Sequence, residues 1–360
     1  MKRIHNFAAG PSTLPSEVIK ELSEELPEYN NSGMSLIEMS HRGDDFGQIH
    51  QNAIDTLKRL CKVPDDFQVL LLQGGATLQF TMSAYNQGIA NESAGYVVAG
   101  TWGKKAYNDA SKIGMAYEAW NGSVEGFIRM PKLGEIDLHP ATKYIHLTSN
   151  ETINGVRVHD FVDMGPKQVI DMSSDFLTRD IPWDILDIAY GGAQKSIGPA
   201  GLCVVFVRKS IIDKASPDIP DYINYAYHAK GNSMSNTPPV FAIWAAQKML
   251  KWIENQGGVP EMQKRSEQKS KLIYDVIDGS EGFYTNPVNV ADRSLTNVVF
   301  RLKTEKLEKN FIEQAEAEDM LNLKGHRSVG GIRASLYNGL EIASAEKIAS
   351  YMQNFASQMG

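Results

Sequence analysis

Cysteine is scarce in this sequence: only Cys61 and Cys203, among 360 residues, carry a thiol. A domain stapled by disulfides and a cysteine-rich zinc module both need more cysteines, so neither class of protein fits. We expect each thiol to lie buried as a small apolar side chain rather than to act as a nucleophile.

Long apolar segments are also missing from the sequence. A membrane-spanning helix needs about 18 apolar residues in a row, whereas the longest runs, such as LCVVFV, have the length of a strand. The first residues, MKRIHNFAAGPSTLP, contain no apolar core of the kind that a secretory signal peptide has. We therefore expect a soluble chain in the reducing environment of the cytoplasm, with no membrane partner.

The chain carries no block of positive charge. Lys and Arg number 36 against 43 for Asp and Glu, which gives a formal net charge of −7. Nucleic-acid binding needs clustered cations, so that class of function is disfavoured. The sequence does contain ample apolar material, 42% of all residues, and its length is typical of about two domains.

Short apolar runs between residues 65 and 210 predict the strands of a sheet. They lie at 67–73, 94–100, 143–149, 167–173, 184–192 and 202–210. The runs are continuously apolar rather than alternating, which indicates strands covered on both faces, and helical segments separate several of them. Both features are typical of an α/β fold with a mainly parallel sheet.

The pattern changes after residue 237. Pro238 and Pro239 precede a helical stretch at 240–256, which we expect to stop at Gly257, Gly258 and Pro260. A charged helix at 261–278, a strand at 296–302 and a helix at 342–355 follow. These segments predict a smaller α+β domain that begins near residues 256–260.

The segment IAYGGAQKSIGPAGL (188–202) places Lys195 on a glycine-rich turn between two apolar strands. An ammonium removed from water has a lowered pKa, and a neutral amine can attack a carbonyl to form a Schiff base. A solvated turn lysine is the plainer alternative. A nucleotide-binding P-loop does not fit, because Gln194 replaces the glycine before the lysine and Pro199 precedes a strand rather than a helix.

A carboxylate at a neighbouring strand end gives Lys195 a chemical context. Asp171 ends the run QVID, 24 residues before the lysine. Pyridoxal phosphate needs this pair, a lysine for its aldehyde and an aspartate that keeps its ring nitrogen protonated. Alone, Asp171 could equally be a helix cap or a surface carboxylate.

Two further strand ends could serve the same cofactor. QGGAT (73–77) follows the run VLLL and opens a helix, so its backbone N–H groups could bind a phosphate, although a simple tight turn explains it too. The sequence contains no GxGxxG after any predicted strand, which disfavours a dinucleotide. Trp102, at the end of AGTW, could stack on a flat ring or belong to the core.

Cationic side chains occur in three glycine-containing segments. SHRG contains His41 and Arg42, GHRSVGG contains His326 and Arg327, and GGIRASLYN contains Arg333. Guanidinium groups bind carboxylates and phosphates through two parallel hydrogen bonds, so the segments together indicate a small polyanionic substrate. The remaining histidines, at 5, 50, 139, 146, 159 and 228, show no metal-ligand spacing.

Taken together, the motifs resemble those of the phosphoserine aminotransferase family, which belongs to the class V aminotransferases and to the fold-type I pyridoxal-phosphate enzymes. They are FAAGPSTLP, MSHRG, QGGAT, SNETINGV, the Asp171 strand, AQKSIGPAGL, MSNTPP, GHRSVGG and GGIRASLYN. They span nearly the whole chain; one departure is Ser196, where relatives often have asparagine. The implied fold has a large domain at 16–258 with a seven-stranded, mainly parallel sheet between helices. Residues 1–15 and 259–360 form the small α+β domain.

The resemblance also implies roles for residues around the cofactor pyridoxal 5′-phosphate. Lys195 forms the Schiff base and Asp171 pairs with the ring nitrogen, while Trp102 stacks on the ring and Thr152 binds its 3′ oxygen. The cofactor phosphate is implied to lie at Gly75, Ala76, Ser173 and Gln194, completed by Asn236 and Thr237 of a neighbouring subunit. The family is therefore expected to be a homodimer with composite sites.

For the substrate, the resemblance implies that Arg333 binds the α-carboxylate. His41 and Arg42, reaching across the dimer, would bind the distal phosphate or carboxylate with His326 and Arg327. The implied reaction interconverts O-phospho-L-serine plus 2-oxoglutarate with 3-phosphooxypyruvate plus L-glutamate in serine biosynthesis. Use of 4-phosphohydroxy-L-threonine in pyridoxine biosynthesis is left open.

Two alternatives stay open at the level of sequence. Another class V enzyme, such as an alanine–glyoxylate aminotransferase, shares the cofactor motifs, whereas a cysteine desulfurase needs a mobile thiol that neither Cys61 nor Cys203 is placed to supply. A protein that binds a ligand or nucleotide without catalysis would not absorb visible light.

Overall fold

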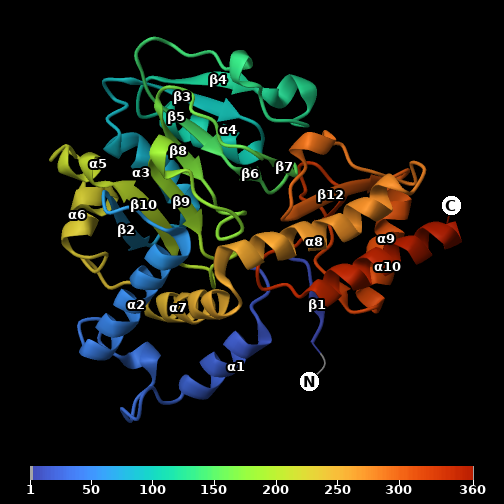
Figure 1. The fold of residues 1–360 in the computed structure, drawn as a ribbon, viewed down its shortest axis with the longest axis horizontal. Helices are drawn as coiled ribbons and strands as arrows, with labels where there is room; N and C mark the ends of the chain where they lie inside the picture. Colours follow the sequence, from blue (N-terminus) through green and yellow to red (C-terminus); the bar gives the residue numbers. More distant parts are fainter. Residues whose placement is uncertain (1–2, 360) are drawn as a thin grey trace.

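A mixed sheet forms the centre of the computed structural model, which describes residues 3–359 (Figure 1). Within those residues seven strands lie in the order β2-β10-β9-β8-β5-β3-β4, and all run parallel except β10. Their bounds are β2 (Phe67–Leu72), β3 (Ser93–Val98), β4 (Ala116–Asn121), β5 (Thr142–Thr148), β8 (Lys167–Asp171), β9 (Leu186–Gly192) and β10 (Cys203–Arg208). The predicted α/β fold with a mainly parallel sheet is confirmed.

The reversed direction of β10 follows from the length of the chain before it. Residues 193–202 join β9 to β10, and a connection this short, without a crossover helix, returns the chain antiparallel to the strand it leaves. This turn carries Lys195. The glycine-rich segment therefore does not lead into a helix, as a P-loop would.

Helices cover both faces of the sheet, which explains the continuously apolar strands. In β10, Val204 and Phe206 belong to one core with α2 (Asp44–Cys61) and α7 (Val240–Asn255). Val205 and Val207 face the other core, under α3 (Gly75–Asn86) and α4 (Thr101–Ala110).

A smaller unit packs beside the sheet, in the orange and red part of Figure 1. Its strands β11 (Tyr284–Thr285), β12 (Asn297–Leu302) and β14 (Ile332–Ser335) form a sheet against α8 (Gly258–Asp278), α9 (Glu305–Ala317) and α10 (Ile342–Met359). A third core forms here, and Phe7 from the start of the chain belongs to it. The short strand β1 (His5–Asn6) pairs in parallel with β13 (Met320–Leu321).

Helix α8 joins the two units. The break between the two helices is shorter than the sequence indicates. Helix α7 ends at Asn255, and Gly257 (φ +110°) is the N-cap residue of α8, which starts at Gly258. Pro260 lies in the first turn of α8, where no intrahelical N–H is needed. Val259 and Met262 pack in the first core, whereas Ile273 and Ile277 pack in the third. The division into 16–258 and 1–15 plus 259–360 is therefore a proposal that these cores support.

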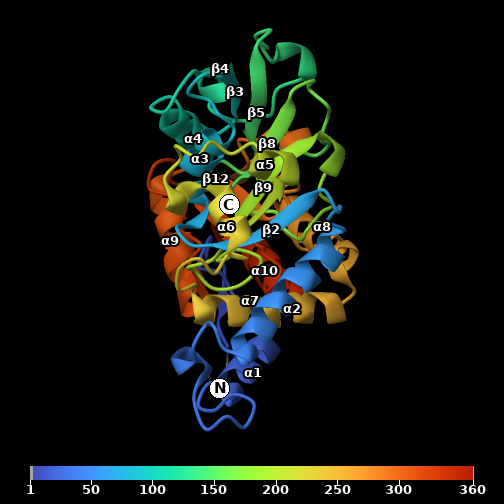
Figure 2. The same cartoon turned by 90° about the vertical axis from the view of Figure 1, so that its left-hand side faces the viewer.

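The remaining elements are short and lie mostly at the surface. They are α1 (Ser16–Glu25), α5 (Lys209–Asp213), α6 (Tyr225–Lys230), β6 (Asn150–Glu151), β7 (Val156–Arg157), and the 3₁₀ turns η1 (Leu36–Glu38), η2 (Gly122–Glu125), η3 (Leu133–Glu135), η4 (Trp183–Ile185), η5 (Asp221–Ile223) and η6 (Val290–Asp292). Figures 1 and 2 agree that α1 and β4 lie at opposite ends of the molecule. Among residues 3–359, no helix has the length and apolar character needed to cross a membrane.

Candidate active site

Lys195 lies just beyond the carboxyl end of β9, as expected from the sequence. Its Nζ donates a hydrogen bond of 2.7 Å to Thr152 Oγ1 and stands 5.6 Å from the centre of the Trp102 ring. Burial lowers the pKa of the amine to about 8, and the nearby carboxylates of Asp171 and Glu151 offset part of that shift. A substantial fraction of Lys195 is therefore a neutral nucleophile and base at mildly alkaline pH.

Asp171 is the last residue of β8, the strand beside β9. It is 4% exposed, and its Oδ1 accepts hydrogen bonds from Ser173 N (2.9 Å) and Ser173 Oγ (2.6 Å). Burial raises the pKa of this carboxyl, while Lys195 and Ser173 act in the opposite direction. In the described part of the chain no hydrogen bond reaches Oδ2, so this oxygen is available to a donor such as a protonated ring nitrogen.

The N-terminus of α3 lies at the same edge of the sheet, directly after β2. Gly74 precedes the helix with φ +83°, and a Cβ there would come within 2.4 Å of Leu78, so glycine is required. No side chain of the described residues caps this helix. The N–H groups of Gly75 and Ala76 are therefore positioned to bind an anion.

Two more predicted phosphate ligands make contacts within the chain, Ser173 through its side chain and Gln194 through its backbone. Ser173 Oγ, besides donating to Asp171, accepts the N–H of Gly192. The backbone oxygen of Gln194 accepts from Ser12 N at 2.9 Å. The first residues of the chain thus lie against the lysine turn, a contact that their irregular sequence does not predict.

The loop with Asn236 and Thr237 lies beside the same helix start. Gln73, the residue before Gly74, accepts from Asn236 Nδ2 at 3.2 Å and donates to the backbone oxygen of Thr237 at 3.0 Å. Gln73 thus connects this loop to the phosphate-binding segment of its own chain. The sequence analysis assigns Gln73 no role, although it is the first letter of QGGAT.

Arg333 and His326 line one cavity, which the small unit forms with residues 126–127 and 153–154. Arg333, on β14, donates weakly to the backbone oxygen of Thr152 (3.5 Å), and its buried Nε has no partner among the described residues. Burial lowers the pKa of His326, and the charges of Arg333, Arg327 and Lys105 lower it further. The surroundings of His326 are therefore cationic, as an anionic substrate needs.

His41 and Arg42 lie elsewhere, in the turn before α2. Within the described residues no hydrogen bond or ion pair joins them to Lys195, Asp171 or Arg333. The role of His41 and Arg42 across a dimer therefore stays a prediction.

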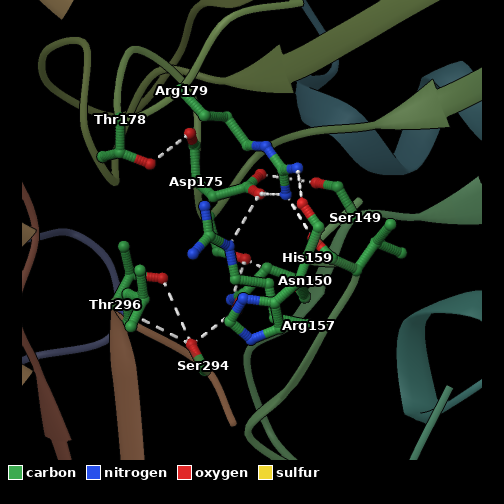
Figure 3. Close-up of polar contacts among 12 residues, drawn as sticks. Ser149, Asn150, Arg157, His159, Asp175, Thr178, Arg179, Ser294 and Thr296 are labelled. Carbon is green, nitrogen blue, oxygen red and sulfur yellow. Dashed lines mark hydrogen bonds and ion pairs between the residues drawn. The ribbon is translucent and has the colours of Figure 1, made fainter. Parts of the chain in front are cut away.

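A hairpin formed by β6 and β7 holds several of these parts together. The hydroxyl of Thr152 accepts a hydrogen bond from Lys195. Glu151 accepts the backbone N–H groups of Trp102 and Gly103 at the start of α4. Behind it, Figure 3 shows a buried polar cluster in which Asp175 lies near the guanidinium groups of Arg157 (3.8 Å) and Arg179 (3.5 Å). The polar sequence SNETINGV reads as a loop, so the buried position of Glu151 is not predictable from it.

The same cluster connects the hairpin to the small unit. Asn150 donates to the side chain of Asn297, at the start of β12, and accepts from Ser294. Asn297 in turn donates to Ser335, at the end of the strand that carries Arg333. The position of Arg333 relative to Thr152 and Lys195 therefore depends on these amide contacts.

Both thiols are buried and unpaired, and burial raises their pKa values, which fits the expected structural role. Across residues 3–359, no group of three or more His, Cys, Asp or Glu side chains is arranged to hold a metal ion.

The chain can now be compared with known proteins. The family described as "Aminotransferase class-V" matches residues 4–347. A phosphoserine aminotransferase from Laribacter hongkongensis is 44% identical over 99% of both chains, and one from Lysinibacillus sphaericus is 42% identical over 98% of both.

Solved structures agree with the sequence relatives. A phosphoserine aminotransferase from Bacillus circulans subsp. alkalophilus superposes with a TM-score of 0.97 at 41% identity over the whole of both chains. A pyridoxal-phosphate-bound phosphoserine aminotransferase from Trichomonas vaginalis gives 0.93 at 33% identity, covering 98% of this chain and all of its own. An aspartate aminotransferase from Thermus thermophilus, at 18% identity and 0.77, covers 99% of both chains and shares the fold. The chain belongs to the class V aminotransferases and, within them, to the phosphoserine aminotransferase family.

Proposed function

We propose that the protein is a pyridoxal-phosphate-dependent transaminase that interconverts O-phospho-L-serine plus 2-oxoglutarate with 3-phosphooxypyruvate plus L-glutamate, a step of serine biosynthesis. The observation that carries the proposal is the position of Lys195, whose amine faces Thr152 and the Trp102 ring and is influenced by the charges of Asp171 and Arg333. Full-length relatives above 40% identity support the choice of substrate.

The residues present fit pyridoxal phosphate. Asp171 offers a buried carboxylate oxygen to a ring nitrogen, and Trp102 offers a ring face beside Lys195. The uncapped start of α3 offers N–H groups for a doubly charged phosphate, which Ser173 and Gln194 would supplement. When bound, the cofactor supplies an aldehyde for amines and an electron-poor ring that stabilises negative charge at the substrate's α-carbon.

Lys195 would both attach the cofactor and act as the catalytic base. Its lowered pKa keeps part of the amine neutral, so Nζ can attack a carbonyl carbon and, once released, take the proton from the substrate's α-carbon. The hydroxyl of Thr152 holds Nζ at 2.7 Å and would bind the cofactor's 3′ oxygen. Asp171 would keep a proton on the ring nitrogen, since a buried carboxylate is stable only beside a positive partner.

Substrate recognition uses cationic side chains of the small unit, of which Arg333 and His326 line one cavity. Arg333 binds the α-carboxylate that all amino donors carry, and its half-buried guanidinium makes few competing hydrogen bonds. His326 and Arg327 bind the distal phosphate or carboxylate. Because glutamate and phosphoserine both have a distal anion, the same cations serve both substrates.

The distal site is complete only in a homodimer. His41 and Arg42 of the partner subunit would join His326 and Arg327, and Asn236 and Thr237 of the partner subunit would reach the cofactor phosphate. The two unpaired thiols are consistent with the cytoplasm, which we propose as the compartment.

A spectrum of the purified protein tests the proposal. With pyridoxal phosphate bound, the visible absorption should shift on addition of phosphoserine or glutamate and return on addition of 2-oxoglutarate. Alanine should change it slowly. An equally fast response to alanine would favour an alanine–glyoxylate type of activity, and no visible band would contradict the cofactor.

A further inference from the structure

Glu151 is a fully buried carboxylate (0% exposed) that the proposed chemistry does not use. Its Oε2 accepts the backbone N–H of Trp102 at 2.9 Å, and its Oε1 accepts that of Gly103 at 2.7 Å. No lysine, arginine or histidine of the described residues lies within ion-pair distance of it. The carboxylate is thus balanced by the first turn of α4 and not by a cation.

Two glycines close to Trp102 leave room for this carboxylate. A Cβ on Gly100 would lie 2.5 Å from the carboxyl carbon of Glu151, and one on Gly103 would lie 3.2 Å from Oε1. Gly100 has an extended backbone (φ −177°) that any residue could adopt, so its small size and not its flexibility is what the site needs. Both glycines flank Trp102 closely.

The same hairpin covers the rest of the helix start. Asn154 Oδ1 accepts the N–H of Thr101 at 3.2 Å, so three successive N–H groups of α4 are bound by β6–β7 side chains. An oxygen acceptor at a helix start stabilises the first turn, and a charged one does so more strongly. The backbone of Trp102 is therefore fixed at its own nitrogen by Glu151.

We propose that Glu151 is a positioning residue that sets the indole of Trp102 against the cofactor ring. The inference rests on the proposed function, since it assumes that Trp102 stacks on that ring. Glu151 precedes Thr152, which holds Lys195, so one hairpin fixes both the stacking surface and the reactive amine. Because both carboxylate oxygens bind backbone N–H groups, Glu151 is not poised to exchange protons with a substrate.

The two helix N–H groups favour the ionised form of Glu151. Burial raises the pKa of Glu151 to about 7, while the N–H groups of Gly103 and Trp102 counteract that rise. The two other charged groups that act on it are Asp171, which raises its pKa, and Lys195, which lowers it. A neutral side chain of the same shape, glutamine, turns one acceptor into a donor and so opposes one of the two helix N–H groups.

The test is a double-mutant cycle on cofactor binding. The dissociation constant of pyridoxal phosphate is measured by absorbance titration in the wild type, E151Q, W102A and the double variant. E151Q should weaken binding about tenfold in the wild-type background, as expected for loss of a charge-assisted hydrogen bond, and less than about twofold in the W102A background. The matched control E254Q removes a carboxylate that pairs with Arg59 between α7 and α2 and should leave the constant unchanged.

Equal weakening in both backgrounds, or none in either, would overturn the proposal. A second readout needs no cofactor: the tryptophan fluorescence of the cofactor-free protein, with the W102A spectrum subtracted, should differ between wild type and E151Q. An unchanged Trp102 signal would also overturn it. If E151Q does not fold, E151D, which keeps the charge but shortens its reach, is tested in the same cycle. Failure of the wild type to bind pyridoxal phosphate would instead contradict the proposed function and leave the fluorescence test decisive for Glu151.

Discussion

The helices α3 and α4 make an instructive pair. Each follows a parallel strand, has a glycine as its N-cap residue, and directs its N-terminus to the carboxyl edge of the same sheet. At α3 no side chain of the described residues binds the first N–H groups, whereas at α4 Glu151 and Asn154 bind three of them. A helix start can receive a ligand's anion only where the chain supplies none of its own. We propose that the start of α3 is left for the cofactor phosphate, whereas the start of α4 is closed by side chains that hold Trp102 in place.

Replacement of Lys195, the residue between the two helix starts, should have the largest effect on activity. In Lys195→Ala, kcat for phosphoserine should fall at least 10²–10⁴-fold, the range assigned to acid–base catalysis alone, because nucleophile and base are lost together. Steady-state rates measured with saturating cofactor test this. Lys209→Ala, an exposed lysine at the start of α5, should retain normal activity. Turnover close to normal in Lys195→Ala would show that another group performs the proton transfer.

A carboxylate introduced at the start of α3 should remove the difference between the two helices. In Ala76→Asp, a carboxylate beside the first N–H groups would occupy the phosphate site and repel the phosphate, so cofactor affinity should fall on the order of 100-fold. Absorbance titration measures the dissociation constant, and Ala76→Ser serves as the uncharged control. An unchanged constant in Ala76→Asp would place the phosphate somewhere other than at α3.

Two arginine variants distinguish the sites that bind the two anionic groups of the substrate. Arg327→Ala should reduce kcat/KM for phosphoserine and glutamate by roughly 10–100-fold but barely change the small rate with alanine, which lacks a distal anion. Arg333→Ala should reduce the value for every amino donor, since each carries the α-carboxylate. The ratios of kcat/KM over the three donors decide the matter. Equal losses for all donors in Arg327→Ala would assign that residue to the fold or the cofactor.

The smallest effect is expected for a second buried lysine and concerns the pH dependence of stability. Lys269, 2% exposed on α8, donates to the backbone oxygens of Tyr337 and Leu340, and burial lowers its pKa to about 7. The unfolded chain keeps this proton up to about pH 10.4, so between pH 7 and 10 the unfolded state binds more protons and the free energy of unfolding rises with pH.

Urea denaturation at pH 7.5 and 8.5 measures this dependence. The increase should be smaller in Lys269→Met than in the wild type by about 1 kcal/mol, because methionine has no proton to lose. The comparison between variants cancels the other titrating groups. Identical pH dependence in both proteins would show that Lys269 keeps its charge in the folded state.

The sequence predicts those parts of the fold and the site that depend on neighbours along the chain. The run VVFV is apolar on both faces, so β10 is recognisable, and the strand ends then place Asp171 and Lys195 at one edge. In contrast, the segment AYEAWN of β4 is half-buried and lacks an apolar pattern, so this edge strand escapes prediction.

Contacts between residues that are far apart in the sequence limit what can be predicted from it. Glu151 looks like a surface charge in NETING until α4, about 50 residues earlier in the chain, is folded against it. Asn150 and Asn297 pair in the same way across a sequence separation of 147 residues. Neither amides nor carboxylates carry a local signal that distinguishes a buried partner from water.

The start of the chain has a consequence for how the protein is made. His5 and Asn6 pair with Met320 and Leu321, and Ser12 binds the backbone next to Lys195. A ribosome releases the first strand hundreds of residues before its partner exists. The segment that covers the lysine turn therefore waits, unpaired, until β13 has been synthesised. Completion of the catalytic centre is then tied to completion of the polypeptide, and a nascent or truncated chain would have the sheet in place but no finished site.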